Sequence, residues 1–394
     1  MPQAALTRQQ FDGFRGGAYD TAAEHCRVHF ATPWDLLDVK IDSFPMPASV
    51  VFGTRASEAS ALPTRVQAWS GRVKGSADWS EVADAFTVVE TDTTAFTVDD
   101  APKSEYAARF RQGATLVPRM LALVVDGPTT PMGTAVGMLS VQSRKSSLDK
   151  EPWKSLPIHT GTVEATFVRT VLLGESVLPF RVDRPSRGVI PHDGTDVLDG
   201  SNPRIDRYPG LAKWWRAAEA IWEENAGPKN TLALGGRFDF HRELRAQFPA
   251  APIRVVYSKA GNHLAAAVVR DANAVIDHML YWGAAASESE SLFLVTVLNS
   301  TTLGDAVRPF QSAGAFGPRH FDKYVWYAPI PIFDSANALH LDLARLGAAA
   351  EAVAASVPLA EGVGFQAARA QVRAALAGSI GPDIESAVRS LLQF

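Results

Sequence analysis

The sequence has one cysteine, Cys26, among 394 residues. A single cysteine cannot form a disulfide framework within the chain, and it excludes any zinc site that needs several cysteine ligands. The sequence also lacks an apolar run of about 18 residues, the length that a membrane-spanning helix requires. No charged segment followed by an apolar core and a cleavage site opens the chain, so no secretory signal is expected. These absences predict a cytoplasmic protein with no membrane segment.

The familiar signatures of catalytic centres are also missing. The sequence contains no Walker A loop and no Gly-x-Ser-x-Gly, His-Glu-x-x-His or Gly-x-Gly-x-x-Gly motif, each of which would indicate a particular chemistry. His25 and His29 lie four residues apart in an expected strand, with no obvious third ligand. The carboxylates show no pairing suited to acid–base catalysis. We therefore expect no catalytic residue, bound cofactor or metal site in this chain.

The length and charge of the chain limit the possible folds but do not indicate a function. The chain is long enough for two domains, each with a core of its own. Its 25 prolines and 29 glycines are spread along the sequence and argue against an all-helical bundle. The 38 basic residues nearly balance the 42 acidic ones, so net charge neither indicates nor excludes nucleic acid. The mixture of elements predicts a mixed α/β (α+β) protein.

Composition divides the chain into four stretches. Residues 1–56 have a short expected helix and two expected strands, and residues 57–115 are polar and threonine-rich, as in a linker or insertion. Residues 116–335 alternate between strand and helix patterns, and residues 336–394 form an alanine-rich helical tail.

Two elements inside the third stretch are clearly patterned. Residues 208–225 predict a helix whose tryptophans Trp214, Trp215 and Trp222 share one face, as core residues do. Three short strands are then expected over 254–257, 263–269 and 274–278, separated by residues typical of hairpin turns. A further helix is expected over residues 287–299.

The segment between Ile253 and Arg270 contains no acidic residue. Its strand–turn–strand pattern places Lys259, Asn262 and His263 near one tip. Side-chain donors gathered at such a tip could reach phosphates or base edges in a DNA groove. The alternative is a solvated hairpin in which lysine and asparagine merely suit a turn.

A second segment without acidic residues runs from Arg308 to His320 and leads on to Lys323. It combines glycines and aromatic residues with polar side chains suited to a polynucleotide-contacting loop. An ordinary Gly/Pro connector with its aromatic rings packed inward is an equal alternative.

Several stretches taken together resemble one protein family. Leu298-Asn-Ser300, the basic loop after it and Ala328-Pro-Ile-Pro331 are similar to the C-terminal target-recognition region of adenine-specific N6 DNA methyltransferases. In that family, a helix ending in Leu-Asn-Ser precedes a glycine-containing basic loop and a strand ending in Pro-Ile-Pro. Further similar blocks lie at residues 173–181, 236–242, 256–259 and 275–278. The resemblance covers roughly residues 116–345.

The N-terminal stretch extends the resemblance. Residues 1–11 look like the segment that follows the family's catalytic tetrapeptide, and residues 44–55 look like the last strands of its catalytic domain. The resemblance therefore implies that residues 1–56 are the C-terminal remnant of a Rossmann-like methyltransferase sheet. Unpaired strand edges in such a remnant would invite completion by a partner chain.

The sequence departs from the family at its catalytic motifs. The family uses a glycine-rich loop for S-adenosylmethionine and an Asn/Asp/Ser-Pro-Pro-aromatic tetrapeptide that holds the extruded adenine. This chain has no Pro-Pro dipeptide and no such loop. The resemblance thus implies the DNA-recognition part of a split or truncated methyltransferase of a bacterial restriction or phage-defence system. S-adenosylmethionine is expected on a protein partner or on a missing N-terminal segment.

Double-stranded DNA is the expected ligand, and nine residues are the expected contacts. These residues are Lys259, Asn262, His263, Arg308, Gln311, Ser312, Arg319, His320 and Lys323. The basic residues would mostly position phosphates, whereas Asn262 and Gln311 suit adenine edges.

Two other interpretations stay open. The first is a non-catalytic protein-binding scaffold of a defence operon, because residues 237–323 have nine basic against eight acidic residues. The second is a stand-alone enzyme whose site assembles from scattered residues.

Overall fold

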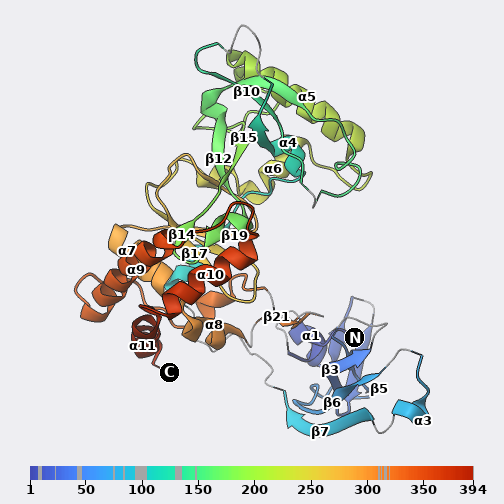
Figure 1. Cartoon of the computed structure of the whole chain (residues 1–394). Coiled ribbons are helices and arrows are strands. Elements are labelled where there is room, and N and C mark those ends of the chain that lie inside the picture. Colours follow the sequence, from blue (N-terminus) through green and yellow to red (C-terminus); the bar gives the residue numbers. More distant parts are fainter. Residues whose placement is uncertain are drawn as a thin grey trace. The chain divides into compact units, whose positions relative to one another are not determined.

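The computed structural model divides the chain into two compact units. Unit 1 comprises Met1–Pro102 and Val307–His320, and unit 2 comprises Lys103–Ala306 and Phe321–Phe394. Helices and sheets occur throughout (Figure 1), so the predicted mixed α/β class is confirmed. The finer boundaries expected at residues 56, 115 and 335 stay predictions. The structure describes all residues except 8–10, 23, 42–46, 74–75, 83–84, 94–103, 129–134, 147–148, 309–310, 312, 315–316, 319 and 394.

Unit 1 is built mainly from two small sheets. The first has the order β1 (Ala18–Asp20), β2 (His25–Phe30) and β5 (Gly53–Arg55). The second has the order β4 (Ser49–Val50), β3 (Trp34–Ile41), β6 (Arg65–Val73) and β7 (Phe86–Asp92). Its remaining elements are α1 (Ala4–Thr7), α2 (Asp12–Arg15), α3 (Trp79–Val82) and the hairpin of β20 (Ala313–Gly314) and β21 (Gly317–Pro318). A small core gathers around Phe30 and Val66.

Strand pairing in unit 1 differs from the partial Rossmann-like sheet expected for residues 1–56. The named strands within this range pair antiparallel, and the parallel pair joins β3 to β6, beyond residue 56. A Rossmann-like sheet needs parallel strands joined by crossovers of a dozen or more residues, usually helical. The described α-helices of this unit have only four residues each, so they cannot supply that crossover.

Unit 2 contains a six-stranded sheet covered by one long helix. The strand order is β11 (Thr160–Glu164), β10 (Met138–Ser143), β9 (Leu123–Asp126), β15 (Ser186–Val189), β12 (Val168–Leu172) and β18 (Val275–Ile276). Helix α5 (Pro209–Asn225) runs alongside this sheet (Figure 1). The Glu164 carboxylate accepts hydrogen bonds from the first free N–H groups of α5, at Gly210 and Leu211. Trp214, Trp215 and Trp222 are buried in the core of this unit, as predicted.

A four-stranded sheet forms the second centre of unit 2. Its order is β17 (Ala266–Val269), β16 (Arg254–Ser258), β19 (Leu280–Ala284) and β8 (Arg111–Gln112). Helix α7 (Glu288–Asn299) packs on β16 and β17, and α9 (Ala338–Ser356) packs on α7. The other named α-helices and strands are α4 (Arg119–Ala122), α6 (Leu234–Phe238), α8 (Thr301–Val307), α10 (Phe365–Ala377), α11 (Gly381–Leu392), β13 (Val177–Leu178) and β14 (Arg181–Val182).

The expected run of three neighbouring strands is only partly formed. β16 and β17 pair antiparallel, as their turn residues indicate, but β18 pairs in parallel with β12 of the other sheet. The Gln247 amide fixes β18 there, because it accepts from the Ile276 N–H at 2.8 Å and donates to the Ile276 carbonyl at 2.9 Å. This side chain comes from a distant segment, so local periodicity could not reveal the pairing.

Candidate nucleic-acid interface

The first group of predicted contacts lies where β16 gives way to its connection with β17. The Ser258 hydroxyl at the end of β16 accepts a hydrogen bond from the Ala265 N–H at 3.1 Å, which closes the connection. Asn262 and His263 are exposed at this tip, and Lys259 is half-buried at its base. The sequence therefore placed these three residues correctly relative to the hairpin.

Backbone hydrogen bonds bring a second segment to the same tip. The N–H groups of Phe321 and Asp322 donate to the Lys259 carbonyl at 2.9 and 3.3 Å. The Tyr257 hydroxyl donates to the Asp322 carbonyl at 2.8 Å. Exposed Lys323 follows directly. Lys259, Asn262, His263 and Lys323 thus gather at one end of the four-stranded sheet, which we call the β16 tip.

The two lysines of the β16 tip differ in their electrostatic surroundings. Lys259 Nζ lies 3.6 Å from Asp322 Oδ1, and both side chains are partly exposed. Ion pairs of this kind contribute little free energy, so a phosphate could compete for Lys259. Lys323 projects into solvent and forms no ion pair with any residue that the structure describes.

Sequence reasoning did not single out a carboxylate beside the tip. Burial raises the pKa of Glu243, while the charges of His241, His278 and Lys259 and a hydrogen bond from Thr115 oppose that shift. His241 itself has a φ of 54°, a left-handed conformation that non-glycine residues rarely adopt. The groups around Glu243 come from distant parts of the chain. Two of the blocks that resemble the methyltransferase family, 236–242 and 275–278, contain His241 and His278.

The remaining five predicted contacts lie either in unit 1 or outside the described residues. Arg308, Gln311 and His320 are part of unit 1, where Arg308 and His320 are exposed. The Gln311 side chain is buried, and its Nε2 has no hydrogen-bond partner among the described residues. Ser312 and Arg319 lie outside the described residues. The seven predicted contacts that the structure describes are therefore divided between two units.

The described part of the chain has neither a metal cluster nor a membrane-spanning helix. In that part, no group of three or more His, Cys, Asp or Glu side chains is arranged to hold a metal ion. None of its helices combines the length and the apolar character needed to cross a lipid bilayer.

Comparison with known proteins finds similar solved structures but no similar sequence family. No protein-family model and no curated protein matches the sequence. The Type IIL restriction-modification enzyme MmeI, solved in complex with DNA, aligns at 11% identity and a TM-score of 0.47. The type IIG restriction endonuclease BpuSI aligns at 12% identity and a TM-score of 0.31.

Each alignment covers most of this chain but only part of the enzyme it is aligned with. They include 93% and 100% of this chain, but 43% of the MmeI chain and 47% of the BpuSI chain. This chain therefore spans less than half the length of either enzyme.

Proposed function

We propose that unit 2 recognises a DNA sequence for adenine-N6 methylation, as the specificity part of a split or truncated methyltransferase of a restriction or phage-defence system. The observation that carries the proposal is the β16 tip. This tip joins two segments that lie far apart in the sequence. One segment carries Lys259, Asn262 and His263 and the other carries Lys323, and hydrogen bonds hold both at one end of β16. Gathered donors of this kind suit duplex DNA.

The side chains at the β16 tip divide the work of recognition by their chemistry. Lys323 and Lys259 would contact phosphates and position the protein on the duplex. The Asn262 amide can both donate and accept, as an adenine edge requires. The Glu243 and Asp322 carboxylates repel phosphates but accept from base amino groups, so they favour contact with base edges over non-specific backbone binding.

The distribution of charge supports DNA binding by unit 2. Unit 1 contains 10 basic and 14 acidic residues, whereas unit 2 contains 28 of each. The net charge of −4 therefore resides in unit 1. Unit 2 presents no net negative charge to a phosphate backbone, so a local group of exposed donors can act without an overall repulsion.

S-adenosylmethionine does not fit the described residues of unit 1. A binding site for this methyl donor would need a glycine-rich loop that leads into a helix N-terminus. The described α-helices of this unit have four residues each, so they are too short to provide such a site. The proposal therefore places the methyl donor and the catalytic tetrapeptide on a partner protein or on a preceding segment.

The Lys323→Ala variant tests the proposal by titration of duplex DNA at several salt concentrations. Loss of one phosphate contact should weaken binding to all sequences and reduce the slope of log K against log salt by about 0.9. Lys229→Ala is the matched control, since Lys229 is also exposed in unit 2 but lies in the loop after α5. Unchanged affinity and slope in Lys323→Ala would contradict the assignment of the β16 tip.

A protein-binding scaffold is the second candidate, and the surface of unit 1 favours it. On the edge strand β7, Val88 is 43% exposed and Val89 is 56% exposed. Apolar side chains on an edge strand are suited to a protein partner. Absence of any salt-dependent duplex binding by the full chain would favour this function over DNA recognition.

A further inference from the structure

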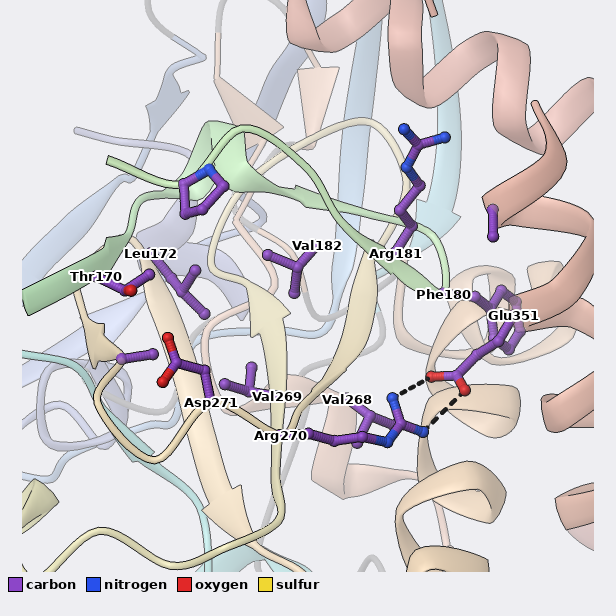
Figure 2. Close-up of a pocket in the computed structure, with 13 residues that line it drawn as sticks. Thr170, Leu172, Phe180, Arg181, Val182, Val268, Val269, Arg270, Asp271 and Glu351 are labelled. Atoms are coloured by element: carbon purple, nitrogen blue, oxygen red, sulfur yellow. Dashed lines mark hydrogen bonds and ion pairs between the residues drawn. The ribbon is translucent and has the colours of Figure 1, made fainter. Parts of the chain in front are cut away.

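Unit 2 contains a pocket of about 440 Å³ that the DNA-recognition proposal does not use. Its walls come from β12 of the six-stranded sheet, β17 of the four-stranded sheet, β14 and helix α9 (Figure 2). A pocket where separate layers meet, and of this volume, is typical of small-molecule sites. The volume admits a molecule of modest size rather than a protein segment.

The middle of the pocket is apolar. Leu172, Val182 and Val269 face one another there (Figure 2). Phe180 extends this surface toward α9. Such walls favour a flat hydrocarbon or aromatic body, because its burial removes apolar surface from water on both sides.

Both arginines of the pocket are already occupied by partners within the chain. Arg270 donates to Glu351 at 2.8 and 3.1 Å and also pairs with Glu288. Arg181 donates to the carbonyls of Ala354 and Val357 at 3.1 and 3.0 Å and contacts Asp183. The charge of Arg270 is already balanced by two carboxylates and that of Arg181 by Asp183, so the pocket offers little net attraction to a phosphate or a carboxylate.

The opposite end of the pocket has unused capacity to accept hydrogen bonds. The Asp271 carboxylate and the Thr170 side chain lie at this end (Figure 2). Asp271 Oδ1 accepts one bond, from the Asn273 N–H at 2.8 Å, which leaves further lone pairs for a ligand. Buried Arg254 donates to the carbonyls of Asp271 and Ala274 at 2.8 Å and holds this turn in place.

The pocket wall is also held in an uncommon backbone conformation. Phe180 has a φ of 59°, a genuine outlier for a bulky side chain. Its N–H donates to the Ala266 carbonyl at 2.8 Å, which secures the residue against β17. Conformations of this kind cluster at ligand clamps and active sites, and here the outlier places an aromatic ring in the wall.

We propose that this pocket binds a small molecule with a flat apolar body and a cationic hydrogen-bond donor, such as an amine or amidine, directed at Asp271. The body lies between Leu172, Val182 and Val269, and the donor group satisfies the free acceptors of Asp271. This site is independent of the DNA function proposed for the β16 tip.

Calorimetric titration of the full chain with three probes of similar size tests the ligand class. Benzamidine is cationic, benzyl alcohol is neutral and benzoate is anionic. Benzamidine should saturate one site, and benzoate should bind about tenfold more weakly or not at all. Asp271→Asn should weaken benzamidine about three- to fivefold and leave benzyl alcohol unchanged. Equal binding of benzamidine and benzoate would overturn the proposal.

A second pair of variants tests the location without disturbing the core. Ala355 is an exposed residue of α9 that lines the pocket, and Ala352 is exposed on the same helix outside the lining. Ala355→Trp should fill the mouth and abolish benzamidine binding, whereas Ala352→Trp should leave it intact. Benzamidine binding that survives Ala355→Trp, or that both variants reduce equally, would show that the probe binds elsewhere.

Discussion

At the scale of single residues, two buried histidines act as neutral hydrogen-bond acceptors. His192 Nδ1 accepts from the Gly194 N–H at 3.0 Å, and His340 Nδ1 accepts from the Asp334 N–H at 2.9 Å. A protonated ring nitrogen could not accept either bond. Burial lowers the pKa of both imidazoles, in agreement with this geometry. Protonation of these side chains therefore opposes folding.

The sign of this effect predicts acid sensitivity for His192. A histidine whose folded-state pKa is lowered contributes full stability above the unfolded value of about 6.5 and loses it as the pH falls through the folded pKa. The free energy of unfolding should therefore fall below about pH 6.5, with a slope of at most about 1.4 kcal/mol per pH unit from this group.

Chemical denaturation across this pH range measures the contribution. His192→Asn keeps an acceptor for the Gly194 N–H but cannot be protonated, so its stability should depend less on pH. It also loses the ring stacked on Phe248 at 3.9 Å, so stability near neutral pH should fall. His29→Asn, at an exposed position, is the control. An unchanged pH dependence in His192→Asn would show that other groups cause the acid sensitivity.

At the scale of elements, the closest contact between α7 and α9 depends on a glycine. A Cβ added to Gly347 would lie 2.5 Å from Thr296 Oγ1 and 2.6 Å from the Leu292 carbonyl oxygen. The Thr296 hydroxyl shares its proton between the Leu292 carbonyl of its own helix at 2.7 Å and the Leu343 carbonyl across the interface at 3.1 Å. The two helices can approach and exchange this bond because position 347 has no side chain.

Gly347→Ala should therefore destabilise the protein even though alanine favours helix. The gain in helix propensity is about 1 kcal/mol, whereas overpacking a close interface typically costs about 1–3 kcal/mol. We expect a net loss of up to about 2 kcal/mol in the free energy of unfolding, measured by denaturant titration.

Gly304→Ala is the matched control for this prediction. Gly304 also lies within a helix, α8, but a Cβ there would meet no atom within 4 Å. This variant should gain up to about 1 kcal/mol. A stabilised Gly347→Ala would mean that α7 and α9 separate at little cost.

The helices of unit 2 were largely predictable from sequence where a local pattern of apolar residues determines them. Apolar spacing predicted α5 within one residue of its observed start, and Ser287 marked the beginning of α7. The partners of β18 and the position of Glu243 were not predictable, because both depend on contacts between segments far apart in sequence. The strand pairing of residues 1–56 was not predictable either: β1 and β2 pair antiparallel, as do β3 and β4, whereas the parallel partner of β3 is β6, which lies outside that range.

At the scale of the whole molecule, the excess of acidic residues belongs to one unit only, which the net charge of the chain does not show. Unit 1 has four more acidic than basic residues, and unit 2 is balanced. Arg308, a basic residue among the predicted DNA contacts, thus belongs to the acidic unit. This separation was not predictable from the sequence, because residues 307–320 lie far along the chain from the rest of unit 1.

The path of the chain between the units has a consequence for modular exchange. The backbone crosses from one unit to the other after residues 102, 306 and 320. A recombination event that transplanted residues 103–394 as one continuous block would also carry a 307–320 segment deprived of its own unit. A chimaera that receives a foreign unit 2 therefore has to take it as two separate segments, 103–306 and 321–394, and keep the host's own residues between them.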